Sequence, residues 1–304
     1  MSYYTSLYIS VCISLISVLS MYLLVGLTGI FSMGQAAFMA VGAYGAGLLA
    51  LRSPLPMAVN IVCAILLGML FAFGVGIPVI KLRRDYIALI TLAFGEAVVA
   101  LLNNATEFTG GSLGLNGIPR SVNAPLVTIL LVATIFIIIN FKKSRFGRQC
   151  LAVKSDEISA AAMGINTARI KMTVFVMAGG ITAFAGALWA YLTTYVEPNA
   201  FAQKMSIEWI IIVFIGGVHS LSGALFAGVL LTLLPEVLRF TDNLRIVIYS
   251  IIVIIIINFL PKGLFGENEF IDILRKVGKP ILKFFGKGAK TGEKISTREG
   301  TKNE

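Results

Sequence analysis

A single carboxylate stands well inside the apolar stretch LITLAFGEAVVALL. This residue is Glu96, and Thr91 lies on the same apolar run. A carboxylate at the depth of a bilayer is costly and usually faces the interior of a helix bundle, where it has a partner. Glu96 is therefore a candidate functional residue. A second interpretation stays open, in which a protonated or hydrogen-bonded Glu96 only fixes the contacts between helices.

The other reactive residue types form no catalytic or metal-ligating pattern. His219 is the sole histidine, and Cys12, Cys63 and Cys150 have no paired spacing. The chain has no G-x-x-x-x-G-K-[ST] phosphate loop, so it lacks the usual cradle for ATP. We therefore expect no metal, no cofactor and no enzymatic activity, with any ATP bound by a partner subunit. We interpret His219 as a polar residue at a helix break rather than as a proton relay.

The composition predicts an all-α, polytopic bundle of membrane helices. Of the 304 residues, 57% are hydrophobic and 13% are charged, and several apolar runs are long enough to cross a bilayer. The net charge of +10 is concentrated at the ends of these runs and in the tail, which indicates topology and anionic lipid rather than nucleic acid. We expect about nine spans within residues 1–261, between eight and ten, with an external N-terminus and a cytoplasmic C-terminus. The predicted spans are residues 7–27, 36–51, 57–80, 86–102, 122–141, 172–192, 207–215, 224–238 and 246–260.

Two glycine-rich breaks interrupt the apolar pattern, at residues 29–34 and 216–223. Irregular backbone at membrane depth is tolerated only where protein buries it or where it lines a cavity. The two breaks resemble each other at one constant offset, and paired broken segments are typical of transporter repeats. The charges predict parallel copies, whereas an inverted repeat needs one crossing more or fewer. The predicted translocation path comprises Gly29, Ser32, Gly34, Gln35, Thr91, Glu96, Gly217 and Ser220.

A polar segment at residues 142–171 separates the apolar runs and carries seven cations against two acids. Because cations accumulate in short cytoplasmic loops, this loop is placed inside the cell. Its middle predicts a short helix that Ser155 caps and Gly164 ends, with Asp156 and Glu157 in the first turn. Such a helix could dock a partner, although an ordinary positive-inside loop explains the charges as well.

The remaining segment, residues 262–304, is predicted to be a basic cytoplasmic tail. Its first part places apolar residues at helical spacing, which suits an interfacial helix, and its Gly/Lys/Thr-rich end is predicted to be disordered.

Five blocks of sequence resemble the M-type permease of branched-chain amino acid ABC importers. They are GLTGIFSMGQAAFMAVGAYGAGLLA (26–50), ITLAFGE (90–96), TGGSLGLNGIP (109–119), SRFGRQCLAVKSDEISAAAMGIN (144–166) and IGGVHSLSGALFAGVLLTLLPEVLR (215–239). The resemblance extends to about residue 261. It implies a multi-pass permease in a bacterial or archaeal cell membrane that admits branched-chain or related small amino acids. It also implies three kinds of partner: a sister permease, two cytoplasmic ATPases and an external binding protein.

The same resemblance suggests which loop contacts the ATPase. The matching residues are Asp156, Glu157, Ala160, Ala161, Gly164 and Ile165. Glu157 is displaced from the spacing that ABC importers usually have in this loop. Gln35 stands where the family often has histidine.

The sequence leaves three alternative functions to be weighed against an amino acid permease. The chain could be a permease of the same family for urea, amides or other small solutes. It could also be a secondary transporter that couples ions through Glu96. An integral-membrane enzyme is disfavoured, since no constellation of catalytic residues is present.

Overall fold

The computed structural model describes residues 3–53, 55–82, 84–238, 244–260 and 263–264. This part of the chain is almost entirely helical, as the composition predicts. Within it, five helical segments are long and apolar enough to cross a membrane: Tyr3–Thr28, Met57–Val79, Tyr86–Asn104, Ala124–Lys143 and Thr167–Thr193. The predicted tail lies outside the described residues, except for Gly263 and Leu264.

The apolar helices follow the predicted spans closely. They are α1 (Tyr3–Met21), η1 (Tyr22–Thr28), α2 (Gln35–Arg52), α3 (Met57–Val79), α4 (Arg84–Asn104), α6 (Ala124–Lys143), α9 (Thr167–Thr193), α10 (Gln203–Gly216), α11 (Leu221–Val237) and α12 (Leu244–Phe259). The connecting elements are α5 (Thr106–Thr109), η2 (Gly111–Leu113), β1 (Leu115–Asn116), α7 (Arg145–Ser155), α8 (Glu157–Ala162), β2 (Tyr195–Val196) and η3 (Pro198–Phe201).

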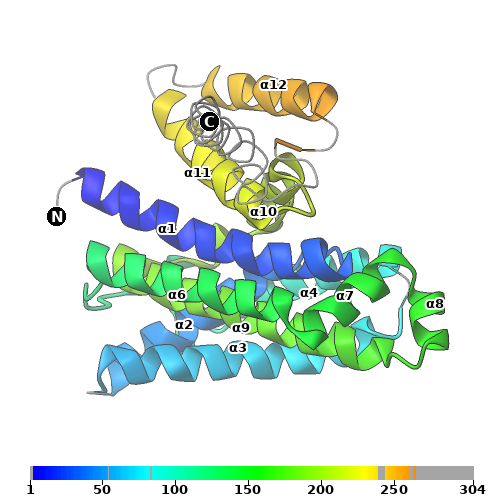
Figure 1. Cartoon of the computed structure of the whole chain (residues 1–304). Helices are drawn as coiled ribbons and strands as arrows, with labels where there is room; N and C mark the ends of the chain where they lie inside the picture. Colours follow the sequence, from blue (N-terminus) through cyan, green and yellow to red (C-terminus); the bar gives the residue numbers. More distant parts are fainter. Residues whose placement is uncertain (1–2, 54, 83, 239–243, 261–262, 265–304) are drawn as a thin grey trace, which may run out of the picture.

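Helix α1 lies in the middle of the bundle. It packs against α6 and α9 on one side and against α10 and α11 on the other, and Figure 1 shows it between these two groups. Its second half is buried over almost every residue, whereas α3 and α6 expose most of their side chains. The interior helix is therefore apolar all round, as expected where both faces contact protein.

Small residues let α2, α3 and α9 pack closely. A Cβ on Gly42 would lie 2.0 Å from the carbonyl oxygen of Ala183, and one on Gly186 would lie 2.0 Å from the carbonyl oxygen of Met39. The backbones of α2 and α9 thus touch directly. Since lipid gives no hydrophobic force between helices, such close approach is a main source of packing energy in a membrane.

The two ends of the bundle differ in character. At one end, which we call the N end, the Tyr3 hydroxyl donates to Glu236, and the Arg120 guanidinium donates to the Ser6 hydroxyl at 2.8 Å. Strands β1 and β2 pair antiparallel, Leu115 with Val196, and join the connection between α4 and α6 to the connection between α9 and α10. At the other end, the loop end, α7 and α8 project from the bundle (Figure 1).

Candidate functional site

The first break follows a stretch of π-helix. Residues Tyr22–Thr28 form η1, and Gly29 then adopts φ 68°, in the left-handed region that favours glycine. The break is largely buried, and within the part of the chain that the structure describes the Ser32 hydroxyl has no hydrogen-bond partner. Short π-helical stretches inside α-helices are frequently found at functional sites. The sequence indicated a break here but gave no sign of the π-helix before it.

The second break follows an ordinary α-helix. Helix α10 ends at Gly216, and Gly217 adopts φ 104°. Ser220 then caps α11, since its hydroxyl accepts a hydrogen bond from the Gly223 N–H at 3.1 Å. The backbone therefore turns with few unsatisfied groups.

The two breaks lie side by side. The Tyr22 hydroxyl donates to the carbonyl oxygen of His219 at 3.3 Å. A Cβ on Gly26 would lie 3.1 Å from the carbonyl oxygen of Val218. The structure thus brings the π-helix that precedes the first break against the second break, although nearly two hundred residues separate them.

The first break also meets the middle of α4. The Met33 N–H donates to the Thr91 hydroxyl at 3.1 Å. A Cβ on Gly34 would lie only 1.9 Å from the carbonyl oxygen of Thr91. Gly34 and Thr91, both predicted to belong to the path, are therefore in direct contact.

Gln35 begins α2 and organises a buried polar cluster. Its side-chain amide donates to the hydroxyls of Ser20 at 2.9 Å and Thr182 at 3.1 Å, and those two hydroxyls lie 2.5 Å apart. The Gln35 Oε1 atom is buried without a partner. Ser20 and Thr182 were missed from the sequence because isolated hydroxyls in apolar runs carry no pattern.

Glu96 is not brought together with the other predicted path residues. The inward side of α4 carries Thr91 and Val98, which are buried, and Phe94, which packs against Phe38. Glu96 points the other way and is exposed, together with Ala93, Ala97 and Ala100. The remaining predicted path residues are all buried within this chain.

The loop end carries the predicted short helix, with one correction. Asp156 rather than Ser155 caps α8, because the Asp156 carboxylate accepts from the Ile158 N–H at 3.0 Å. Ser155 closes the preceding helix, and its hydroxyl donates to the carbonyl oxygen of Leu151. Gly164 follows the end of α8 with φ 82°. Helix α7 itself was not predicted, since its many cations obscured the pattern.

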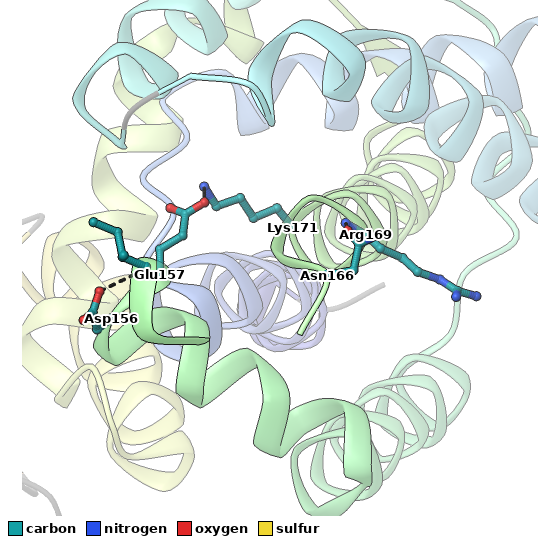
Figure 2. A network of polar contacts seen from close by, with 6 residues as sticks. Asp156, Glu157, Asn166, Arg169 and Lys171 are labelled. Carbon is teal, nitrogen blue, oxygen red and sulfur yellow. Dashed lines mark hydrogen bonds and ion pairs between the residues drawn. The ribbon is translucent and has the colours of Figure 1, made fainter. Parts of the chain in front are cut away.

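An ion pair fastens α8 to the bundle. The Lys171 ammonium lies 2.5 Å from the Glu157 carboxylate, and Lys171 is only 2% exposed (Figure 2). The Glu157 side chain is 37% exposed, so solvent screens the pair, and losing one partner costs less than in a fully buried pair, where the cost is about 3–5 kcal/mol. The Glu157 carboxylate thus faces Lys171 of this chain.

The outward face of α8 is apolar. Ile158 and Met163 are 82% and 83% exposed, whereas Ala160 is 3% exposed and Ile165 packs partly against the core. Ala161 is exposed beside them. Large apolar side chains exposed at a helix tip are typical of an interaction surface.

Two lysines connect this loop to the π-helix before the first break and to the second break. The Lys154 ammonium, on α7, donates to the carbonyl oxygen of Gly26 in η1 at 2.7 Å. The Lys142 ammonium, at the end of α6, donates to the Tyr22 hydroxyl at 2.9 Å and to the carbonyl oxygen of His219 at 3.2 Å. The loop end is therefore hydrogen-bonded directly to η1 and to the second break.

Another carboxylate inside an apolar helix escaped the sequence analysis. Glu208 lies in α10, near its start, and is partly buried. Glu208 was not singled out because it is the second residue of the predicted span 207–215, where a charge at the end of a span is ordinary. Among the described residues, no group of three His, Cys, Asp or Glu side chains could hold a metal ion.

Comparison with known proteins places these features in a family context. The profile of the family described as "Branched-chain amino acid transport system / permease component" matches residues 3–257. The high-affinity branched-chain amino acid transport system permease protein LivM of Salmonella typhimurium is 30% identical over 280 residues. That match covers 81% of this chain but 66% of LivM, so the chain spans slightly less than two thirds of this relative.

Two further relatives belong to different transport systems or subunits. The permease protein LivH of the same organism's high-affinity branched-chain amino acid transport system is 25% identical over 185 residues, 59% of each chain. The autoinducer 2 import system permease protein LsrC of Escherichia coli O9:H4 is 29% identical over 236 residues, 67% of this chain and 68% of LsrC. No solved structure matches the chain.

Proposed function

Because the chain belongs to the family of permease components of branched-chain amino acid transport systems, we propose that it lines the membrane path of an ABC importer. The substrates in this proposal are branched-chain or related small amino acids. A binding protein outside the cell delivers them, a sister permease completes the path, and two ATPases drive transport. The loop end is cytoplasmic, as the concentration of cations there supports.

The observation that carries this proposal is the surface of α8. This helix is fixed to the bundle by the pair between Glu157 and Lys171, and it presents Ile158 and Met163 outward. A rigidly held helix with two apolar anchors suits a groove in a folded partner. The cytoplasmic partner that an ABC permease needs is the ATPase.

The contacts of Lys142 and Lys154 supply the link from that docking surface to the path. Lys154 connects α7 to the π-helix, and Lys142 connects the end of α6 to the π-helix and to the second break. Because short π-helical stretches inside α-helices are frequently found at functional sites, we infer that η1 is the segment that shifts. Displacement of α8 by the ATPase would in this way change the geometry at Gly29 and Gly217.

The outward face of α4 supports contact with a sister permease. Lipid is a poor environment for Glu96, since a charge at the centre of the bilayer costs about 2.5–3.5 kcal/mol on insertion scales. Ala93, Ala97 and Ala100 flank it and would let another helix approach closely. Helix α3 exposes Leu66, Leu70, Phe73 and other large apolar side chains, which suit lipid. Helix α4 also exposes Leu89 and Leu101, so Glu96 and the alanines beside it are what distinguish its outward face. Glu96 therefore lines the boundary between the two permeases.

Site-directed crosslinking tests the docking surface. We expect Ile158→Cys and Met163→Cys, in membranes that contain the partner subunits, to crosslink to the ATPase. Ala160→Cys is the matched control, because Ala160 is on the same helix but buried. Burial also raises the pKa of the Cys150 thiol to about 12, so this native cysteine stays protonated and inert at neutral pH. Equal crosslinking from all three positions, or none from any, would contradict docking through this face.

Replacement of Glu96 tests the role of α4. A neutral, hydrogen-bonded carboxyl can be imitated by an amide, so Glu96→Gln should retain most transport. Glu96→Leu removes both donor and acceptor and should lose more. The measurement is uptake at matched membrane abundance. If Gln abolished transport as completely as Leu, the charge itself would be required, and ion coupling or direct binding of a cationic group would be favoured.

The relationship to LsrC favours a second candidate, a permease of this family for a different small solute. Uptake into proteoliposomes that contain the complete transporter distinguishes the two. We expect ATP-dependent uptake of labelled leucine. Isoleucine and valine should inhibit this uptake by competition, whereas autoinducer 2 should not. Inhibition of uptake by autoinducer 2, without inhibition by isoleucine or valine, would instead support the second candidate.

A further inference from the structure

A cavity of about 640 Å³ lies between α10, α11 and α12. Gln203 and Lys204 stand at the start of α10, Pro235 near the end of α11, and Tyr249 in the first part of α12. The neighbour of Pro235, Glu236, contacts Tyr3, so the cavity lies toward the N end of the bundle. In the orientation proposed above, this is the side from which substrate arrives.

The polar groups of the cavity include one anion and one cation. Lys204 and Glu208 are separated by one helical turn, so they lie on the same face of α10, and both line the cavity. Glu208 makes no hydrogen bond with any part of the chain that the structure describes, although it interacts electrostatically with Lys204 and Tyr249. The Tyr249 hydroxyl is buried and has no hydrogen-bond partner among the described residues.

The walls of the cavity are largely apolar. Ile207 and Ile211 on α10 and Pro235 on α11 form them. A few convergent polar groups in an otherwise apolar pocket are typical of a site for a small molecule. Two unsatisfied groups, Glu208 and Tyr249, are costly in such surroundings unless a ligand or water satisfies them.

We propose that this cavity is an entry site for a zwitterion that carries a primary ammonium, an anionic group and an apolar portion. Glu208 accepts hydrogen bonds from the ammonium, and Lys204 and the Tyr249 hydroxyl donate to the anionic group. The apolar portion packs against Ile207, Ile211 and Pro235. This inference rests on the proposed function and deepens it, because an amino acid with an aliphatic side chain has this chemistry.

A phosphatidylethanolamine headgroup has the same pair of charges. The experiment therefore varies amino acid and lipid independently. The complete transporter, with its native cysteines replaced and Ile211→Cys as reporter, is placed in nanodiscs of phosphatidylethanolamine or of phosphatidylglycerol. The rate at which a small water-soluble thiol reagent labels the reporter is then measured with and without ligand.

We expect L-leucine to slow labelling in both lipids. Leucinol, which lacks the carboxylate, and the corresponding acid without the amine should protect at least about tenfold more weakly, the loss expected for one charge-assisted hydrogen bond. Slow labelling in phosphatidylethanolamine alone, unaffected by leucine, would support the zwitterion site and assign it to lipid. Equal protection by leucine and both analogues would overturn the proposal.

Variants of the two charged residues keep the test independent of folding defects. Glu208→Gln and Lys204→Met should each remove protection by leucine, while Lys204→Arg retains it. The exchanged variant, Lys204→Glu with Glu208→Lys, should restore protection because the zwitterion can bind in reverse. Uptake of leucine without any protection of the reporter would refute this site while leaving the proposed function intact. Absence of uptake by the unaltered transporter would instead count against the proposed function.

Discussion

The two glycine-rich breaks each turn at a glycine with positive φ, but the turns and their surroundings differ: Gly29 has ψ 21° and Gly217 has ψ 117°. Gly29 and Gly217, which correspond at the constant offset between the two similar segments, both adopt positive φ. The first break follows a π-helix and leaves the Ser32 hydroxyl unpaired, whereas the corresponding Ser220 caps its helix. Helix α2 begins only at Gln35, while α11 begins directly after Ser220. The first break is therefore the less regular of the two.

Their surroundings differ as well. Phe38 is fully buried against α4 and α9, whereas the corresponding Phe226 is 54% exposed. The comparison teaches that one sequence pattern can serve two purposes. The second break is a capped turn between two helices, and the first is held in place by contacts from α4 and α7. We expect substitutions at the first break to have the larger effects.

The largest effect is expected at Gly34. A methyl group there would occupy the position of the Thr91 carbonyl oxygen, so Gly34→Ala must push α2 and α4 apart. Overpacking of this kind costs about 3 kcal/mol, enough to lower both folded protein and uptake. Gly74→Ala on α3 is the control, since no atom lies within 4 Å of the added Cβ. Thermal unfolding in detergent measures the loss of stability, and an uptake assay measures the loss of transport. Wild-type behaviour of Gly34→Ala would show that α4 can move away from the added methyl group at little cost.

A smaller effect is expected from the lysines at the loop end. Lys154→Met removes the bond to the Gly26 carbonyl, and we expect about a tenfold loss of transport, the worth of one hydrogen bond from a charged donor. Lys142→Met should lose less, because the bond between Tyr22 and His219 remains. The exposed Lys143 provides the control, Lys143→Met.

The lysine variants should separate transport from ATP hydrolysis. If Lys154 transmits motion from the docking surface, its loss leaves ATPase binding intact while substrate no longer stimulates hydrolysis in proportion to uptake. A parallel loss of subunit assembly would mean that Lys154 only stabilises the loop end.

The sequence allowed the helices and both breaks to be predicted, because apolar runs and glycine clusters reflect local constraints. The π-helix could not be predicted, since it uses the same apolar residues as an α-helix. Nor could the direction of Glu96, because periodicity separates the faces of a helix only when their composition differs, and α4 is apolar on both. The pairing of β1 with β2 rests on two residues from each strand, too few for a pattern.

At the loop end, composition and position predicted a short helix but not its orientation. The predicted contact residues included Ala160, which the structure buries, and omitted Ile158, which is exposed. The ion pair of Glu157 with Lys171 fixes which of these two residues faces outward. That pair joins residues fourteen positions apart across a turn. Such contacts depend on how α8 folds back on α9, which local propensity does not determine.

The smallest effects should come from the corresponding serines and would test the comparison most finely. Ser220→Ala removes a helix cap and should cost about 1 kcal/mol of stability. Ser32→Ala removes a buried hydroxyl that has no partner, so it should leave stability unchanged or raise it slightly. Unfolding of the two variants side by side measures the difference. If Ser32→Ala kept its stability but lost uptake, the unpaired hydroxyl would have a role in transport; if both serines cost the same, the two breaks would be equivalent after all.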